Sequence, residues 1–219
     1  MLRFEILNAI AERIGARRYL EIGVQDGVAF RAVNVRTKVG VDPEPRSAAT
    51  VHTTSDEYFA ALPARTRFDL VFVDGLHTAD QVARDIHHAI RHLAPGGAVV
   101  VHDCNPPNEH WAARTGSPLA PGWCGDVYRG WIRSRIAHPD WFHAVVDADL
   151  GCGVIVRRGP WAEPVPLAEE PGTWREFEVD RARWLNTITV EQFRALAAAL
   201  PVPFRRAGVV LPSPEGSVA

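Results

Sequence analysis

The sequence predicts an α/β fold with a parallel sheet that is covered by helices on both faces. Three observations predict it. The chain has 219 residues, of which 47% are hydrophobic, and this is enough to bury the core of one domain. Short apolar runs alternate along the chain with segments of helical periodicity, as in βαβ units. The runs are apolar throughout, which is typical of strands that are buried on both sides.

The first elements are a helix and two strands. In the N-terminal segment 1–18, apolar residues recur at helical spacing between charged ones, so an amphipathic helix is predicted. The run RYLEIG (18–23) predicts a short strand that ends in glycine. The run KVGVDP (38–43) predicts a second strand, which ends in an acid and a proline.

Two further strands flank the clearest helix of the chain. They are FDLVFVD (68–74) and GAVVVHD (97–103). Between them, apolar residues at helical spacing predict a helix that opens with Thr78 and Gln81 as a capping box. We expect this helix to close at the Pro-Gly-Gly turn of 95–97.

The chain after these strands begins with a long loop. Segment 104–125 is rich in Pro, Gly and Trp and lacks periodicity, and a loop this long within a domain is usually functional or disordered. A helix is predicted from about residue 126. The runs WFHAVVDAD (141–149) and GCGVIVRR (151–158) then predict a hairpin.

The domain organisation expected is a core with an extension. Residues 1–158 hold the predicted strands and form the core. Residues 159–219 are proline-rich at first and contain one further helix near 190–200. We expect this C-terminal extension to pack on the core without forming an independent domain, and its role as a dimer contact or as a lid stays open.

Polar, titratable residues end both strands that flank the central helix. Asp74, Gly75 and His77 follow one strand, and His102 and Asp103 follow the other. Strands that are joined by one crossover helix run parallel and end at the same edge, about 4.8 Å apart when they are neighbours. We therefore expect Asp74, His102 and Asp103 to converge on one small ligand or ion, at the edge where open α/β sheets bind ligands.

A glycine turn in EIGVQDGVAF (21–30) follows the first strand directly and opens into a predicted helix. Glycines let the backbone approach a ligand closely and direct helix N–H groups toward it. Asp42 ends the next strand, where a carboxylate would accept hydrogen bonds from ribose hydroxyls. Together these features indicate a ligand that contains a nucleoside.

A nicotinamide dinucleotide is the competing ligand, and a nicotinamide-dependent oxidoreductase is the competing enzyme class. The fingerprint G-x-G-x-x-G needs a second glycine that admits a pyrophosphate, whereas Gln25 stands between Gly23 and Gly27. Asp26 would also repel phosphate. It is more compatible with a cationic ligand such as the sulfonium of S-adenosylmethionine.

In their order along the chain, these motifs resemble those of class I S-adenosylmethionine-dependent methyltransferases. The motifs are YLEIGVQDG, the acid of VGVD, FDLVFVDGLHT, LAPGGAVVVHD and VVDADLGCGVI, and they cover about residues 1–158. The chain looks especially similar to the small-molecule O-methyltransferase group with a D-G-x-H strand end. The resemblance implies a Rossmann-like, doubly wound, seven-stranded sheet, mostly parallel with an antiparallel last strand.

The resemblance also implies S-adenosyl-L-methionine as the cofactor and assigns residues to it. Glu21, Gly23 and Gly27 would line its methionine part, and Asp42 would hold the ribose. Ser55 with Asp56 would lie near the adenine, and Asp74 would also belong to the cofactor site.

Some relatives of this family bind magnesium through acids at the ends of the fourth and fifth strands. Asp74 and Asp103 match those positions, whereas His102 stands where several relatives have an acid. Imidazole suits zinc, iron, nickel or manganese better than magnesium. Two alternatives stay open: Asp74, His102 and Asp103 hold a divalent metal (Mg, Mn, Zn or Fe), or the two acids only cap helices and bind substrate.

The predicted function is transfer of a methyl group to a hydroxyl of a small molecule, such as a sugar or a secondary metabolite. Methyl transfer is an in-line displacement, and most of its rate acceleration comes from orientation and desolvation of the reactants. A hydroxyl acceptor must in addition lose a proton. His77 is the first candidate for the base and His102 is the second; Asp74 is a further candidate catalytic residue. The alternatives are a structural role for His77, in which it fixes the turn, and a non-catalytic cofactor-binding or assembly protein.

Composition limits the partners. A net charge of −2 gives no reason to expect nucleic acid or an anionic membrane surface. No segment has the length and continuity of a membrane span, and the N-terminal helix lacks the features of a signal peptide. Three scattered cysteines fit a reduced compartment. We expect a cytoplasmic protein with a small-molecule acceptor, and a homo-oligomer stays open.

Overall fold

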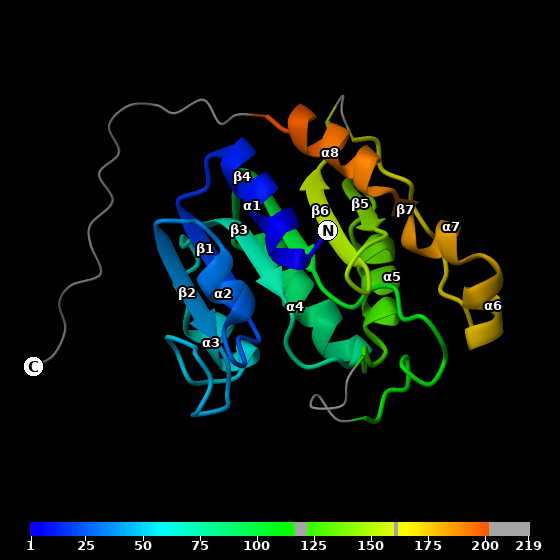
Figure 1. Cartoon of the computed structure of the whole chain (residues 1–219), viewed down its shortest axis with the longest axis horizontal. Coiled ribbons are helices and arrows are strands. Elements are labelled where there is room, and N and C mark those ends of the chain that lie inside the picture. The colour runs from blue at the N-terminus through cyan, green and yellow to red at the C-terminus, as the bar shows by residue number, and fades with distance from the viewer. Residues whose placement is uncertain (117–121, 160–161, 202–219) are drawn as a thin grey trace, which may run out of the picture.

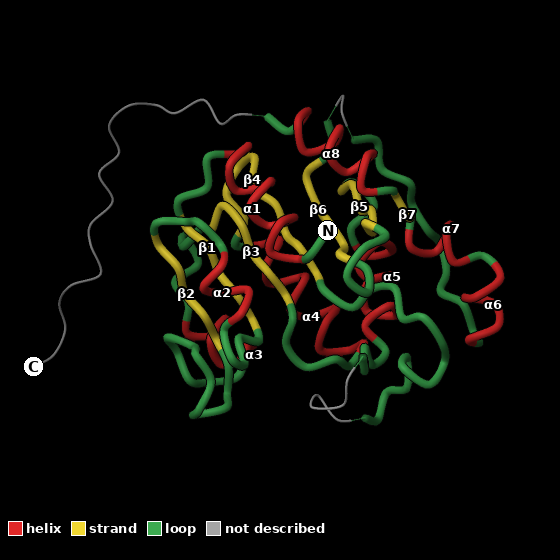
Figure 2. Tube along the Cα trace, in the orientation of Figure 1, coloured by secondary structure: helices red, strands yellow, loops and turns green. Residues whose placement is uncertain are grey.

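A seven-stranded sheet lies between two layers of helices (Figures 1 and 2). The computed structural model describes residues 1–116, 122–159 and 162–201. The strands, in the order β2-β1-β3-β4-β6-β5-β7, are β1 (Arg18–Ile22), β2 (Thr37–Val41), β3 (Phe68–Val73), β4 (Leu93–Val101), β5 (Trp141–Val146), β6 (Cys152–Arg157) and β7 (Thr187–Ile188). The helices are α1 (Arg3–Ile14), α2 (Val28–Ala32), α3 (Ser55–Ala61), α4 (Ala79–Arg91), α5 (Val127–Ala137), α6 (Trp174–Val179), α7 (Arg181–Leu185) and α8 (Val190–Ala199).

The strand directions confirm the predicted fold class. β1 pairs in parallel with β2 and β3, and β3 pairs in parallel with β4. β6, the last strand of the predicted core, is antiparallel to both β4 and β5. The sheet is therefore Rossmann-like and mostly parallel, and the carboxyl ends of β1, β3 and β4 meet at one edge.

Alternate residues of the central strands face opposite helix layers. Val71 and Val73 of β3 belong to the hydrophobic cluster that contains side chains of α3, α4 and α5. Leu70 and Phe72 belong to the other cluster, with side chains of α1, α2 and α8. Both faces of the sheet are covered, which explains why these strands are apolar at every position.

The ends of α4 differ from the prediction. Thr78 makes no side-chain cap hydrogen bond, and Asp126 instead accepts a bond from the backbone N–H of Ala79 at 2.7 Å. Gln81 turns away and donates to the hydroxyl of Ser55 and to Asp85. The predicted capping box is therefore wrong, because an acid distant in sequence satisfies the helix start.

The predicted turn at 95–97 is also wrong, because these residues belong to β4. The helix ends at Arg91, and Leu93 already pairs with Phe68 of β3. A Cβ on Gly97 would lie 2.6 Å from the carbonyl oxygen of Asp69, so the glycine lets β4 approach β3 closely.

The described part of the C-terminal extension packs against the core. β7 adds a parallel edge strand beside β5, and α8 contributes buried side chains to the cluster that contains α1. The buried guanidinium of Arg135 donates to the backbone carbonyls of Arg183, Trp184 and Val165. Residues 202–219 of the predicted extension lie outside the described residues. Among the helices that the structure describes, none has the length and apolar character to cross a membrane.

Candidate functional site

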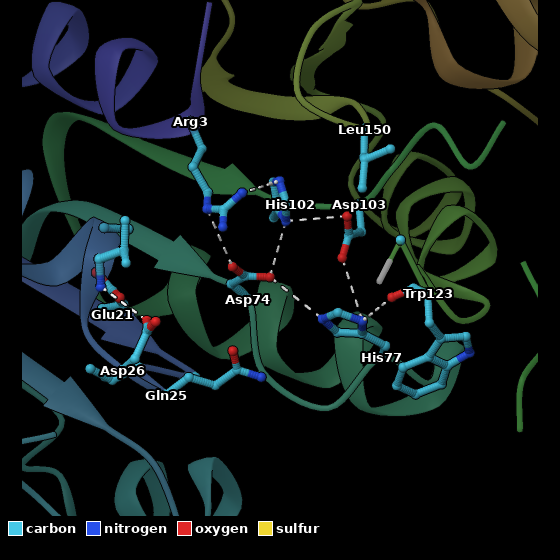
Figure 3. Close-up of a pocket in the computed structure, with 15 residues that line it drawn as sticks. Arg3, Glu21, Gln25, Asp26, Asp74, His77, His102, Asp103, Trp123 and Leu150 are labelled. Carbon is cyan, nitrogen blue, oxygen red and sulfur yellow. Dashed lines mark hydrogen bonds and ion pairs between the residues drawn. The ribbon is translucent and has the colours of Figure 1, made fainter. Parts of the chain in front are cut away.

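A pocket lies at the carboxyl ends of β1, β3 and β4 (Figure 3). Four parts of the chain line it: the start of α1, the glycine turn after β1, the polar residues after β3 and β4, and loop residues that include Trp123 and Leu150. The pocket is therefore at the edge that the sequence predicted for ligand binding.

The polar residues after β3 and β4 form one cluster, which we call the acid–histidine cluster: Asp74, His77, His102 and Asp103. Nδ1 of His102 lies 3.3 Å from Asp74 and 3.2 Å from Asp103. His77 lies between the same two acids, with Nε2 3.5 Å from Asp74 and Nδ1 3.4 Å from Asp103. Each carboxylate thus faces both imidazoles, and the predicted convergence of Asp74, His102 and Asp103 is present in the structure.

Backbone geometry aims Asp103 into the cluster. Asp103 has a φ of 58°, a left-handed conformation that is uncommon outside glycine. Its Oδ1 is buried and accepts no hydrogen bond from the described residues. A buried carboxylate oxygen without a donor is costly unless a ligand or cation satisfies it.

Burial and charge act against each other in the pKa values of the cluster. Burial opposes ionisation of Asp74, but His102 and His77 outweigh it and hold the pKa of Asp74 well below its ordinary value. Burial also opposes charge on His77, but the hydrogen bond and charge of Asp74 raise its pKa above the ordinary value. The cluster therefore keeps Asp74 ionised beside a histidine of increased basicity.

The loop that carries Trp123 holds His77 from the other side. The two rings stack with centroids 5.3 Å apart, and the carbonyl of Trp123 lies 3.3 Å from Nδ1 of His77. Nδ1 faces two acceptors, this carbonyl and Asp103, so it carries a proton as a donor. Nε2 faces the ionised Asp74 at 3.5 Å, so a proton on this nitrogen would be shared with that acid.

The glycine turn packs directly against the end of β3. Gly23 has a φ of 83°, and a Cβ there would lie 2.1 Å from the carbonyl oxygen of Asp74. Asp42 accepts hydrogen bonds from the backbone N–H groups of Val24 and Gln25, both at 2.9 Å. Asp42, which was predicted to hold a ribose, therefore orders the turn.

The structure places the predicted cofactor residues in two groups. Glu21, Gly23 and Asp74 line the pocket together with Gln25 and Asp26. The other four, which are Gly27, Asp42, Ser55 and Asp56, are not among its lining residues. Ser55 and Asp56 begin α3, where Gln81 donates to both. The cofactor roles of all these residues stay predictions.

Sequence reasoning missed two charged residues of this site. Arg3 lines the pocket, and Asp149 contacts both its guanidinium and its backbone N–H. Asp149 lies in the turn between β5 and β6 with a φ of 50°. The sequence did contain a feature that could have identified Arg3. It lies at helical spacing before Ile6, Leu7 and Ile10, so it places a charged residue on the apolar face of α1.

Glu21 is a buried acid at the floor of the site. Burial raises the pKa of its carboxyl to about 8, against the opposing hydrogen bond from the hydroxyl of Tyr19, which donates at 2.5 Å. Only 1% of the residue is exposed. The folded protein therefore binds a proton at Glu21 over a pH range in which the unfolded chain has lost it.

We expect Glu21→Gln to remove a pH dependence of stability. Between the unfolded pKa near 4.5 and the folded pKa of about 8, the native state holds the extra proton, so the unfolding free energy of the wild type falls as pH rises. The fall amounts to roughly 5 kcal/mol at most if this group acts alone. Urea unfolding at intervals from pH 5 to 8.5 should show a flatter profile for Glu21→Gln, whose amide oxygen can still accept from Tyr19. Equal slopes in both proteins would show that Glu21 ionises normally.

Comparison with known protein families gives a match over part of the chain. The family model described as a methyltransferase domain matches residues 20–104, which run from β1 to the residue after Asp103. The match spans the glycine turn, Asp42 and the whole acid–histidine cluster. No curated protein matches this chain in sequence.

Several solved structures share the fold. The O-methyltransferase TomG from Streptomyces achromogenes, which is involved in tomaymycin synthesis and was solved with S-adenosylmethionine, has a TM-score of 0.52 at 21% identity and covers 72% of this chain and 80% of its own. Cofactor-bound Rv0187 from MTB has a TM-score of 0.51 at 20% identity over 72% and 81%. An O-methyltransferase from Bacillus cereus in complex with SAH has a TM-score of 0.50 at 17% identity over 70% and 78%.

Proposed function

We infer that this chain is a class I S-adenosylmethionine-dependent methyltransferase and that it transfers the methyl group to a hydroxyl oxygen of a small molecule. The observation that carries the inference is the pocket, in which the glycine turn and the acid–histidine cluster face each other. One part suits a cationic nucleoside cofactor, and the other suits removal of a proton from an acceptor.

Oxygen is the proposed acceptor atom because the cluster supplies acid–base chemistry. A hydroxyl must lose its proton during methyl transfer, and Nε2 of neutral His77 would accept it, with Asp74, 3.5 Å away, stabilising the imidazolium that forms. The structural neighbours TomG and the B. cereus enzyme are described as O-methyltransferases, which supports the same choice. His102, whose Nδ1 is enclosed by two acids, is the second candidate for the base.

The cofactor is proposed to lie along the glycine turn. Gly23 exposes backbone because it lacks a side chain, and Asp26 lines the pocket with a negative charge that suits a sulfonium ion. Glu21, Gly23 and Gly27 are proposed for the methionine part, Asp42 for the ribose, and Ser55 with Asp56 for the adenine.

The residues present also fit a divalent metal. Asp74, His102 and Asp103 offer one ligand atom each within 4.8 Å of one another, and the buried Oδ1 of Asp103 accepts no hydrogen bond from the described residues, although Nδ1 of His102 lies 3.2 Å away. Two carboxylates and one imidazole suit manganese, iron or zinc better than magnesium. A bound metal would lower the pKa of the acceptor hydroxyl, while this chain's acids and His77 would orient the acceptor and take its proton.

The proposed partner is a small molecule, because the pocket is small and lies between the strand ends and one loop. The net charge of −2 gives no support to a nucleic-acid or membrane partner. We also propose a cytoplasmic location, which is supported by three buried cysteines that form no disulfide. A homo-oligomer stays a prediction.

Calorimetric titration with S-adenosylmethionine tests the proposed function. We expect saturable binding in the presence of a chelator, none for NADH, and weaker binding by Asp42→Ala. The titration is then repeated with magnesium, manganese or zinc to test whether a metal changes the affinity. Folded protein that binds no S-adenosylmethionine under either condition would contradict the proposal.

A further inference from the structure

The edge of the sheet opposite the pocket carries a row of arginines. Each of five neighbouring strands, in the order β2-β1-β3-β4-β6, has one or two of them at this edge. β2, β1, β3 and β4 begin there, whereas β6 runs the other way and ends there (Figure 1). We call this set the arginine row: Arg36 before β2, Arg17 and Arg18 at the start of β1, Arg65 and Arg67 before β3, Arg91 before β4, and Arg157 and Arg158 at the end of β6.

The arginine row has no acidic partner among the described residues. The arginines that form ion pairs there are others: Arg3, Arg84, Arg114, Arg129, Arg133 and Arg183. Arg18 lies over the ring of Phe68, and Arg67 donates to backbone carbonyls, but neither contact neutralises a charge. A guanidinium stays protonated in proteins, so the row is a line of positive charge without counter-charge. Its exposed members are Arg17, Arg36, Arg65, Arg91, Arg157 and Arg158.

The net charge of −2 conceals this row because it sums the two edges of the sheet. Asp42, Asp74 and Asp103 follow β2, β3 and β4 at the pocket edge. The acids at the edge of the row are fewer: Glu12, Asp69, Asp140 and Glu163. Asp69 is already engaged, since it accepts hydrogen bonds from the backbone N–H groups of Arg17 and Arg18 at 2.8 and 3.0 Å. The expectation of no nucleic-acid partner, which came from the net charge, therefore does not apply to this edge.

The length of the row suits a linear polyanion. Neighbouring strands lie about 4.8 Å apart, so five strand ends span about 19 Å. A nucleic-acid strand has one phosphate about every 3.4 Å along a duplex axis and would pass about five phosphates over this distance. Arginine binds phosphate through two parallel hydrogen bonds, and phosphate contacts of this kind supply most of sequence-independent binding.

The composition of this edge favours a nucleic acid over a membrane or a protein. The exposed large apolar side chains of the described chain are Leu2, Val28, Leu76, Val165 and Val179, and none of them adjoins a member of the row in the sequence. Stable binding to an anionic membrane requires an apolar or lipid anchor besides basic charge. A protein interface has an apolar centre within its polar rim.

We propose that the arginine row is a docking surface for a single-stranded nucleic acid, which it holds by the phosphodiester backbone. Contacts to phosphate carry no sequence information, so the affinity should be independent of base sequence. The pocket lies at the opposite edge and stays open while the row is occupied. The inference thus goes beyond the proposed function and does not depend on it.

The test measures binding of a fluorescein-labelled oligothymidylate of about twelve nucleotides to the full chain by fluorescence anisotropy, at about 50 and about 200 mM salt. The variant combines Arg17→Gln, Arg65→Gln and Arg91→Gln, which remove exposed charges from the ends of three neighbouring strands. We expect its affinity to be at least about tenfold lower than that of the wild type at the lower salt concentration. The slope of log K against log salt concentration should decrease in magnitude by about 2, since each lost phosphate contact contributes about 0.7 for a single strand.

The matched control combines Arg46→Gln, Arg175→Gln and Arg194→Gln, which remove the same charge from exposed positions outside the row. We expect its affinity to stay within about twofold of the wild type. Equal losses in the two triple variants would overturn the proposal, and so would a wild type that does not bind the oligonucleotide at the lower salt concentration. Should a thermal melt show that the first variant is unfolded, Arg157→Gln with Arg158→Gln provides the same comparison at the end of β6.

Vesicles of phosphatidylserine and phosphatidylcholine separate a nucleic acid from a membrane as the partner. We expect the wild type to stay in the supernatant when such vesicles are sedimented. Binding to the vesicles that the row variant loses, without binding of the oligonucleotide, would overturn the proposal and assign the row to a membrane surface.

Discussion

Gly23→Ala is expected to abolish binding of S-adenosylmethionine and to destabilise the fold by roughly 3 kcal/mol or more. The added Cβ would lie 2.1 Å from the carbonyl oxygen of Asp74 and 2.5 Å from Cα of Gly75, and both are backbone atoms. The glycine turn or the end of β3 must therefore move. Either movement changes the distance between the glycine turn and Asp74, and both urea unfolding and calorimetric titration should detect it.

Gly96→Ala is the matched control, because Gly96 has almost the same backbone conformation. Its φ is 80°, against 83° for Gly23, but no atom lies within 4 Å of a Cβ built there. We expect it to lose only the cost of a left-handed alanine, about 1 to 2 kcal/mol, and to bind the cofactor normally. Equal losses of unfolding free energy in the two variants would show that the close contact with Asp74 does not contribute to the effect of Gly23→Ala.

The sheet edge could be predicted because it depends on local patterns. Continuous apolar runs predicted β3 and β4, and the crossover helix between them fixed their directions as parallel. With the directions fixed, Asp74, His102 and Asp103 had to share one edge. The approach of Gly23 to Asp74 follows from the same parallel pairing, since Ile22 of β1 pairs with Val73 of β3.

The other parts of the site come from contacts between distant residues. Arg3 and Asp149 are 146 positions apart, and Asp126 caps α4 from a loop 47 positions after Ala79. Periodicity and capping motifs describe neighbours within one element, so they contain no information about such pairs. The capping box at Thr78 failed for this reason: the distant acid Asp126 takes the place of the local threonine, and only the tertiary fold decides between them.

Unusual backbone conformations are concentrated around the pocket. Gln25, Asp103, Asp149 and Leu150 are four of the five residues other than glycine with a positive φ in the described parts of the chain. Each lies in or directly beside the pocket lining. Such conformations cost free energy and persist where surrounding contacts enforce them, which is common at functional sites. A sequence predicts the favoured conformation at each position, so these departures are difficult to foresee.

His77→Gln is expected to lower kcat by about 10² to 10⁴ while leaving the affinity for S-adenosylmethionine within about twofold of the wild type. Glutamine can still donate to Asp103 and to the carbonyl of Trp123, as Nδ1 of His77 does, but it cannot accept a proton. The substitution therefore separates the base from the structural role that the sequence left open. Steady-state kinetics with an acceptor, together with a thermal melt, measure the two effects.

His87→Gln provides the control for this variant, because His87 is exposed on α4 and lies outside the pocket lining. We expect it to keep both kcat and stability. A His77→Gln enzyme that melts early but turns over normally would assign His77 to holding the loop at Trp123, and the base would then be sought at His102. A large loss of kcat at unchanged stability would instead assign His77 to proton transfer, with the ionised Asp74 3.5 Å from its Nε2.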